Sequence, residues 1–354
     1  MTQLLVGTRK GLFVLEGQPG REFDLVTRAF VGESVEFAAR DPRTGRYFVA
    51  VTSTFFGPKI WYADDLDAEW QQATGIALPK GGDQALKRIW VIVAGEDDTT
   101  LYAGGDPAVL FESHDSGETW ELNVPLWEQP SRPQWRRDSG GLSVHTIVPW
   151  PGDPQRLALA ISAAGVWLTE DGGATWRQGN RGIVADYLPE QAQGNSVALC
   201  VHGLERAPGR PERMFMQFHG GVYRSDDAGE SWTGIADGLP SDFGFPVVVD
   251  PADPDSAYVI PVATADRLTP DGRVLVWETR DAGASWQPHG EGLPQHGAWL
   301  SVLRKAFDGI GDGPQLELYF GATSGEIFGS ADAGASWCQV ARRLPSIASV
   351  RAAS

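Results

Sequence analysis

Three histidines of this 354-residue chain have side chains suited to binding a transition metal. His145 and His202 stand at equivalent positions of a repeated segment, and His219 lies in a turn of the same segment as His202. Three neutral imidazoles can hold zinc, iron or copper and leave one coordination position open. A divalent transition metal bound by these histidines is therefore one candidate cofactor, and the sequence itself does not name the cofactor. Since no close pair such as His-x-His is present, two other roles stay open: hydrogen-bonded structural residues, and a general base for a substrate.

Carboxylates are the second set of candidates. Cleavage of a glycosidic bond requires two carboxyl groups at a fixed separation across the bond. Asp106 and Asp242 are the first choices, and Glu36 is the third. The predicted catalytic residues are Asp106, Asp242, His145 and His202. Asp242 lies in "PSDFGFP", whose phenylalanines are expected to stack on a sugar or another ring; the alternative is that Asp242 caps a turn after a proline.

A third set would bind the substrate. Cations gathered at one mouth of a channel would attract a carboxylate or a phosphate. The predicted substrate-binding residues are Arg9, Lys10, Lys59, Arg88, His219, Trp299 and Arg351. The alternative is that the cations pair with Asp106, Asp242 and Glu36 and merely fill the channel.

Two long irregular segments, residues 126–143 and 180–196, precede the strands that carry His145 and His202. Long loops in a compact repeat protein are often functional. We expect these two to border the site, with Arg136 and Arg137 in reach of an anion.

The elements that position these residues follow from an internal repeat. The pattern Ser/Thr-x-Asp-x-Gly-x-Ser/Thr-Trp occurs at Ser113–Trp120, Thr169–Trp176, Ser225–Trp232, Thr279–Trp286 and Ser330–Trp337, and a degenerate copy ends at Trp70. Short alternating apolar runs, separated by small and turn-forming residues, surround each copy and predict four strands per unit. The repeated box then lies in the turn between the third and fourth strands. Radially repeated four-stranded sheets are the blades of a β-propeller.

The chain ends predict how this ring closes. Residues 1–30 supply three strands of a unit without a first strand, and residues 345–354 supply a first strand with nothing after it. Together they complete one blade, which makes seven. The prediction is an all-β, seven-bladed propeller and a single domain over residues 1–354, with no open edge strand.

The box itself is expected to be scaffold. Its Asp accepts backbone hydrogen bonds in a tight turn, its Gly adopts positive φ, and its Trp is buried between sheets. A feature repeated in every blade cannot be one active site. A calcium-binding turn is the alternative.

The repeated box resembles that of the Asp-box, or bacterial neuraminidase repeat, propellers over the whole chain. This superfamily includes sialidases, xyloglucan-cleaving glycosidases, sortilin-type receptors and photosystem II assembly factors. A closer resemblance is to bacterial proteins labelled sialidase-like or glycosyl hydrolase, whose activity is not established. It rests on "VGTRKGLF", "AGGDPAVLFES", "NRGIVADYLP", "HGGVYRSDD" and "GLPSDFGFP". The resemblance implies the propeller fold; it does not fix the chemistry.

Sialidase motifs are missing from the chain. The Arg-Ile-Pro motif of sialidases is absent, the corresponding segment reads "GTRKG", and Tyr319 falls inside a predicted strand. A true sialidase activity is therefore not expected.

The amino-acid composition limits the kinds of binding partner that we expect. A formal net charge of −17 argues against nucleic acid and anionic membranes. The N-terminus lacks the pattern of a signal peptide, and Cys200 and Cys338 lie in different units. A cytoplasmic location is expected, with Cys200 as a small buried apolar residue.

The leading hypothesis is a hydrolase or lyase acting on a small polar, anionic or glycan-like substrate at the mouth of the channel. Two alternatives remain: a non-catalytic scaffold or assembly factor that binds a protein partner, and a sensor of a ligand or metal. Close, buried His and carboxylate groups would favour the enzyme, whereas a channel plugged by apolar side chains would favour the scaffold.

Overall fold

A computed structural model describes residues 1–81, 84–135, 141–190 and 197–353. The fold is nearly all β. Helical structure in the described residues consists of α1 (Val124–Trp127) and short 3₁₀ turns, which include Arg132–Gln134, Pro270–Gly272 and Gly313–Gln315. No helix of this part of the chain is long and apolar enough to cross a membrane.

Five antiparallel sheets have four strands each, in chain order. Their strands are β4 (Ser34–Arg40), β5 (Tyr47–Ser53), β6 (Gly57–Ala63) and β7 (Gln71–Gln72); β8 (Arg88–Ala94), β9 (Leu101–Asp106), β10 (Val109–Ser113) and β11 (Glu121–Leu122); β12 (Val144–Trp150), β13 (Asp153–Ile161), β14 (Gly165–Thr169) and β15 (Arg177–Gln178); β16 (Val201–Arg206), β17 (Met214–Phe218), β18 (Gly221–Ser225) and β19 (Thr233–Gly234); and β20 (Gly244–Val249), β21 (Ala257–Pro261), β22 (Val276–Thr279) and β23 (Gln287–His289).

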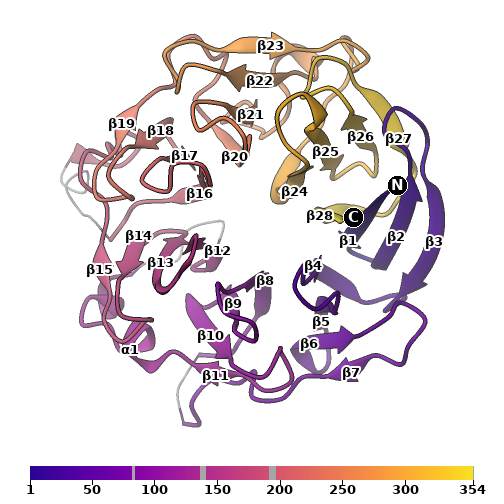
Figure 1. The fold of residues 1–354 in the computed structure, drawn as a ribbon. Coiled ribbons are helices and arrows are strands. Elements are labelled where there is room, and N and C mark those ends of the chain that lie inside the picture. Colours follow the sequence, from indigo (N-terminus) through magenta and orange to yellow (C-terminus); the bar gives the residue numbers. More distant parts are fainter. Residues whose placement is uncertain (82–83, 136–140, 191–196, 354) are drawn as a thin grey trace.

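The remaining strands form one eight-stranded sheet, in the order β27-β26-β25-β24-β28-β1-β2-β3. Their bounds are β24 (Val302–Ile310), β25 (Glu317–Ala322), β26 (Ile327–Ser330), β27 (Cys338–Ala341), β28 (Ile347–Ala353), β1 (Thr2–Thr8), β2 (Gly11–Gly17) and β3 (Asp24–Ala29). The last strand, β28, pairs antiparallel with β1, as the sequence predicted. Its backbone pairing with β24 is the single parallel pair of Lys305 and Ser349. The sheets are set radially around a common centre, and the two chain ends lie side by side (Figure 1).

The repeated box forms one hydrogen-bonded turn in all five full copies. In the second copy, Gly173 N–H donates to Thr169 Oγ1 (2.9 Å), and Thr175 donates from N–H (2.9 Å) and Oγ1 (2.6 Å) to Asp171. The hydrogen bonds from Thr175 lower the pKa of the Asp171 carboxyl below its ordinary value. Each closing tryptophan is buried. Trp232 Nε1 donates to Gly179 O (2.9 Å) of the preceding sheet, so the box fastens neighbouring sheets together.

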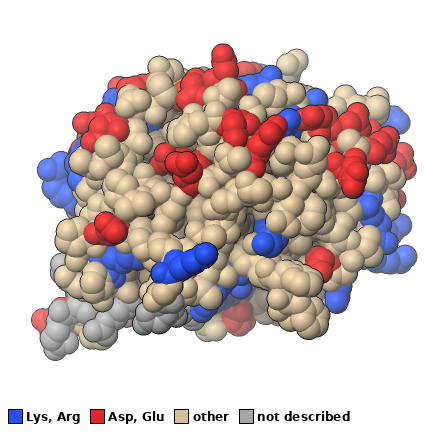
Figure 2. Space-filling view, turned by 90° about the horizontal axis from the view of Figure 1, so that it is seen from below, with Lys and Arg blue, Asp and Glu red and all other residues tan. Residues whose placement is uncertain are grey.

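Charge is divided between the two faces of the molecule. In the side view of Figure 2, acidic residues gather along the upper rim, and basic residues are more frequent below. Exposed acids such as Glu118 and Glu170 belong to the boxes, in the turns between third and fourth strands.

Candidate functional site

A bulge recurs near the start of each inner strand. In β16, Val201 pairs with Phe218 and Gly203 with Gln217, so His202 is left over. A bulge bends its strand and turns the extra side chain in a new direction. The extra residues of the inner strands are Glu36, Trp90, His145, His202, Phe245 with Pro246, Leu303 to Ala306, and Ala348. The bulge explains why side chains that can titrate or bind metal recur near the start of the inner strands.

Side chains of these bulge residues contact one another in the channel. The Arg304 guanidinium lies 5.3 Å from the ring centre of Phe245 and 5.8 Å from that of Trp90. Phe245 also stacks on His202, with ring centroids 5.0 Å apart. Phe243 and Phe245 are 1% and 5% exposed, so the expectation that they stack on a sugar is wrong: they pack against His202.

The cations predicted at one mouth are split. Arg9 binds Glu36 at 2.9 Å, and Arg88 approaches the same buried carboxylate at 3.7 Å, which is the charge pairing kept as the alternative. Lys10 is exposed in the turn after β1. Lys59, also expected at the channel mouth, lies within β6, where it pairs with Val51. The exposed turn between β5 and β6 contains Phe55 and Phe56 instead.

Arg351 also departs from its expected place. It is the fifth residue of β28, and its guanidinium binds Asp308 Oδ1 at 2.7 Å. It lines a cavity farther down the channel, away from the mouth that holds Arg9. Trp299 lies just before β24 and is 56% exposed.

Asp106 and Asp242 are not adjacent. Asp106 ends β9 and is buried, whereas Asp242 is exposed just before β20. The sheets of β12–β15 and β16–β19 separate theirs. Arg136 and Arg137 lie outside the described residues, so no contact of theirs is described.

His145 has a structural arrangement. Its Nε2 lies 2.9 Å from Val201 O, and its Nδ1 lies 2.9 Å from Thr146 Oγ1. Because a carbonyl only accepts, Nε2 carries the proton, and Nδ1 accepts from the threonine hydroxyl. Burial, with the nearby charges of Arg304 and Lys305, holds the pKa of His145 well below its ordinary value. Both ring nitrogens are used, so His145 does not join the other histidines as a metal ligand in this conformation.

Lys305 extends this hydrogen-bonded chain. Its Nζ donates to Thr146 Oγ1 (3.1 Å), so the hydroxyl accepts from the amine and donates to His145. Lys305 lies in the bulge of β24, where residues 303–306 stand opposite the single residue 321. Burial is the main cause that lowers its pKa from 10.5 to about 8, opposed by the charge of Glu205.

The lower channel contains an acid–base cluster. A cavity of about 310 Å³ is lined by Glu205, Lys305, Arg351 and residues of β4, β8 and β12. Burial raises the pKa of Glu205, and Lys305 and Arg351 partly oppose this effect. Within the described chain, no hydrogen bond or salt bridge holds the Glu205 carboxyl. Burial also raises the pKa of Asp308, which accepts from Ala352 N–H (2.8 Å) and holds Arg351. Shifted titratable groups in a cavity mark a candidate active site.

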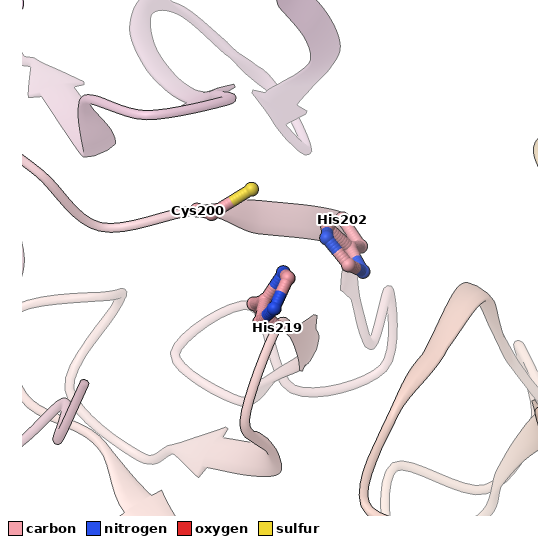
Figure 3. Close-up of side chains that lie close together, drawn as sticks. All are labelled: Cys200, His202 and His219. Atoms are coloured by element: carbon pink, nitrogen blue, oxygen red, sulfur yellow. The ribbon is translucent and has the colours of Figure 1, made fainter. Parts of the chain in front are cut away.

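His202 and His219 do converge, as the sequence suggested, but their third neighbour is Cys200. One ligand atom from each of the three residues lies within 4.8 Å of the others (Figure 3). His202 Nδ1 donates to Gly244 O (2.6 Å), and His219 N–H donates to Cys200 O (3.0 Å).

Sequence reasoning missed Glu205, Lys305, Asp308 and Cys200. The spacing Cys200-x-His202 was a usable signal for the last of these. Nothing in the sequence connects Glu205 with Lys305, because their proximity depends on the bulges and on the radial arrangement of sheets.

Comparisons with known proteins support the propeller fold. No family model matches the chain. The oligoxyloglucan-reducing end-specific xyloglucanase of Emericella nidulans is 23% identical over 175 residues, which are 49% of this chain and 20% of that protein. The chain thus matches about a fifth of that relative's length.

Solved structures are similar at low identity. An ancestral GH74 enzyme gives a TM-score of 0.56 at 15% identity, over 99% of this chain and 40% of that one. YCF48 from Cyanidioschyzon merolae gives 0.59 at 12%, over 87% and 85%. Apo AztD from Citrobacter koseri gives 0.55 at 14%, over 99% and 98%. Identities this low show the fold alone.

Proposed function

We propose that this chain is a hydrolase that cleaves a small polar, anionic or glycan-like substrate in the lower channel. The observation that carries the proposal is Glu205: a carboxyl group with a raised pKa, in a cavity shared with Lys305 and Arg351. The matched xyloglucanase and the GH74 structure support a glycan-type substrate. We also propose that the ring has seven blades, closed by β28 and β1, in one domain of the Asp-box type. A cytoplasmic location stays a prediction.

Each side chain has a role in this proposal. Arg351, held by Asp308, attracts the anionic part of the substrate. Glu205 donates its proton to the leaving oxygen as the C–O bond breaks. Lys305, in its neutral form, takes a proton from the attacking water, whose oxygen forms the new bond to carbon. The hydrogen bond from Lys305 to Thr146 orients the amine.

The shifted pKa values increase the reactive population. Catalysis needs Glu205 protonated and Lys305 neutral at once. When the pKa of the acid lies below that of the base, the fraction of enzyme in this state falls about tenfold for each pH unit that separates the two pKa values. Burial raises the pKa of Glu205 and lowers that of Lys305 to about 8, so both shifts favour the reactive state.

A substrate screen tests the proposal. Neutral, uronate-containing and phosphorylated oligosaccharides would be incubated with the protein, and reducing ends counted. We expect turnover of at least one class, with kcat/KM falling above about pH 8, and a loss of about 10²–10⁴-fold in Glu205→Gln. An unsaturated product would show elimination instead of hydrolysis. Turnover unchanged in Glu205→Gln would refute the assignment.

A further inference from the structure

We propose that Cys200, His202 and His219 form a zinc site at the start of β16, distinct from the acid–base cluster. Cys200 immediately precedes β16, His202 is the second residue of that strand, and His219 lies in the turn between β17 and β18 of the same sheet. The trio therefore needs no loop closure or partner chain to assemble. It rests on geometry alone and does not depend on the proposed hydrolase activity.

Two local features of the backbone bring the side chains together. The bulge at His202 shifts the pairing of β16 and β17. The turn after β17 is tied back to β16, because His219 N–H donates to Cys200 O at 3.0 Å. The three side chains lie next to one another, as Figure 3 shows. Cys200 and His202 are buried, and His219 is partly exposed.

The separations fit a metal after small side-chain rotations. Tetrahedral zinc with its usual Zn–N and Zn–S bond lengths places neighbouring ligand atoms about 3.3–3.6 Å apart. The three ligand atoms here all lie within 4.8 Å of one another, so closure needs movements of about 1 Å. A rotation of this size about χ1 or χ2 leaves the strands in place.

His202 makes the hydrogen bond that is typical of a metal-ligating histidine. Ligating histidines commonly donate the other ring N–H to a carbonyl, which fixes the tautomer. His202 Nδ1 lies 2.6 Å from Gly244 O and must donate there, which leaves Nε2 unprotonated and able to bind a cation. The ring is also held by stacking on Phe245.

The donor set selects the metal. One thiolate with two imidazoles suits zinc, whereas Mg²⁺ and Ca²⁺ prefer oxygen ligands. Three protein ligands would leave a fourth position for water or an exogenous ligand, as in catalytic zinc sites. Neither cysteine of the described chain is in a disulfide, and a metal bound by Cys200 would displace the thiol proton.

The test is metal content after purification without an affinity tag. Wild-type protein, loaded with Zn²⁺ and dialysed against a weak chelator, should retain about one equivalent. His202→Ala and Cys200→Ser should each lower the affinity at least about 100-fold. The exposed His296→Ala is the matched control and should retain the metal.

Cobalt substitution adds a readout of geometry. Co²⁺-loaded wild type should show the intense visible bands of a four-coordinate site and a thiolate charge-transfer band, and Cys200→Ser should lose the charge-transfer band even at Co²⁺ concentrations high enough to offset its weaker binding. Circular dichroism of the metal-free variants separates loss of ligand from loss of fold. Zinc that is absent from wild type after loading, or retained equally by folded His202→Ala, would overturn the proposal.

Discussion

Replacing Lys305 by methionine isolates the energetic effect of burying a charge in the channel. Methionine keeps the unbranched stem and removes the ammonium. The pKa of Lys305 is lowered from 10.5 to about 8 by burial. Between these pH values, the unfolded chain holds a proton on this lysine that the folded chain lacks. Unfolding then takes up a proton, so the stability of the wild type rises with pH in this window.

The magnitude follows from the shift. A lowering from 10.5 to about 8 corresponds to about 3 kcal/mol at roughly 1.4 kcal/mol per unit. Lys305 keeps some contact with solvent in the channel, so we expect about 1–2 kcal/mol. Below pH 8 the wild type carries this full cost, and by pH 10.5 it has lost it. The rest of the shift in the pKa of Lys305 comes from charges that face the same amine, those of Glu205, Asp308, Arg304 and Arg351.

The assay is urea unfolding of both proteins at intervals from pH 7 to pH 10.5. The free energy of unfolding of the wild type should rise by about 1–2 kcal/mol relative to that of Lys305→Met as the pH increases over this range. Lys10→Met, which removes an exposed lysine of a turn, is the charge control. A difference that stays constant across this pH range would refute the burial of an ammonium group in the channel.

Three further predictions concern the scaffold. Trp232→Ala should destabilise the fold by about 3–5 kcal/mol in urea unfolding, because the ring is buried between sheets, whereas the exposed Trp299→Ala should cost under about 0.5 kcal/mol; equal effects would contradict the inter-sheet role. A chain ending at Ser346 loses β28, exposes the edge of β1, and should aggregate or unfold on gel filtration and circular dichroism; a monomeric folded product would contradict the closure. The lowered pKa of Asp171 stabilises the fold above the ordinary carboxyl value near 3.8, and this contribution is lost as pH falls through the folded pKa. Thr175→Val removes the Oγ1 donor, so NMR titration should show the pKa of Asp171 rising toward its ordinary value; an unchanged pKa would contradict the assigned cause.

The repeat made the strands and their order predictable from sequence. Each box marks the turn before a fourth strand, and β28 joins β1 as the unpaired ends required. His202 and His219 were brought together correctly because both belong to one unit. Local patterns suffice for such features, since every unit repeats them.

The acid–base cluster was beyond this kind of reasoning. Lys305 lies where residues 303–306 face one residue of β25, and no alternating pattern encodes such a bulge. Its neighbours Glu205 and Arg351 are far away in sequence and meet only across the channel. Asp106 and Asp242 looked better because they stand at loop ends, yet two sheets lie between them. Electrostatic neighbourhoods of this kind depend on tertiary geometry.

The most direct test of the proposed function compares Glu205→Gln with Asp242→Asn in the same turnover assay, with the exposed Glu170→Gln as control. Each change replaces one ionisable carboxyl group by an amide of nearly the same shape. The acid–base cluster predicts that only Glu205→Gln loses about 10²–10⁴-fold in kcat/KM. Full activity of Glu205→Gln, with loss in Asp242→Asn, would place the chemistry at the mouth of the channel and contradict the account.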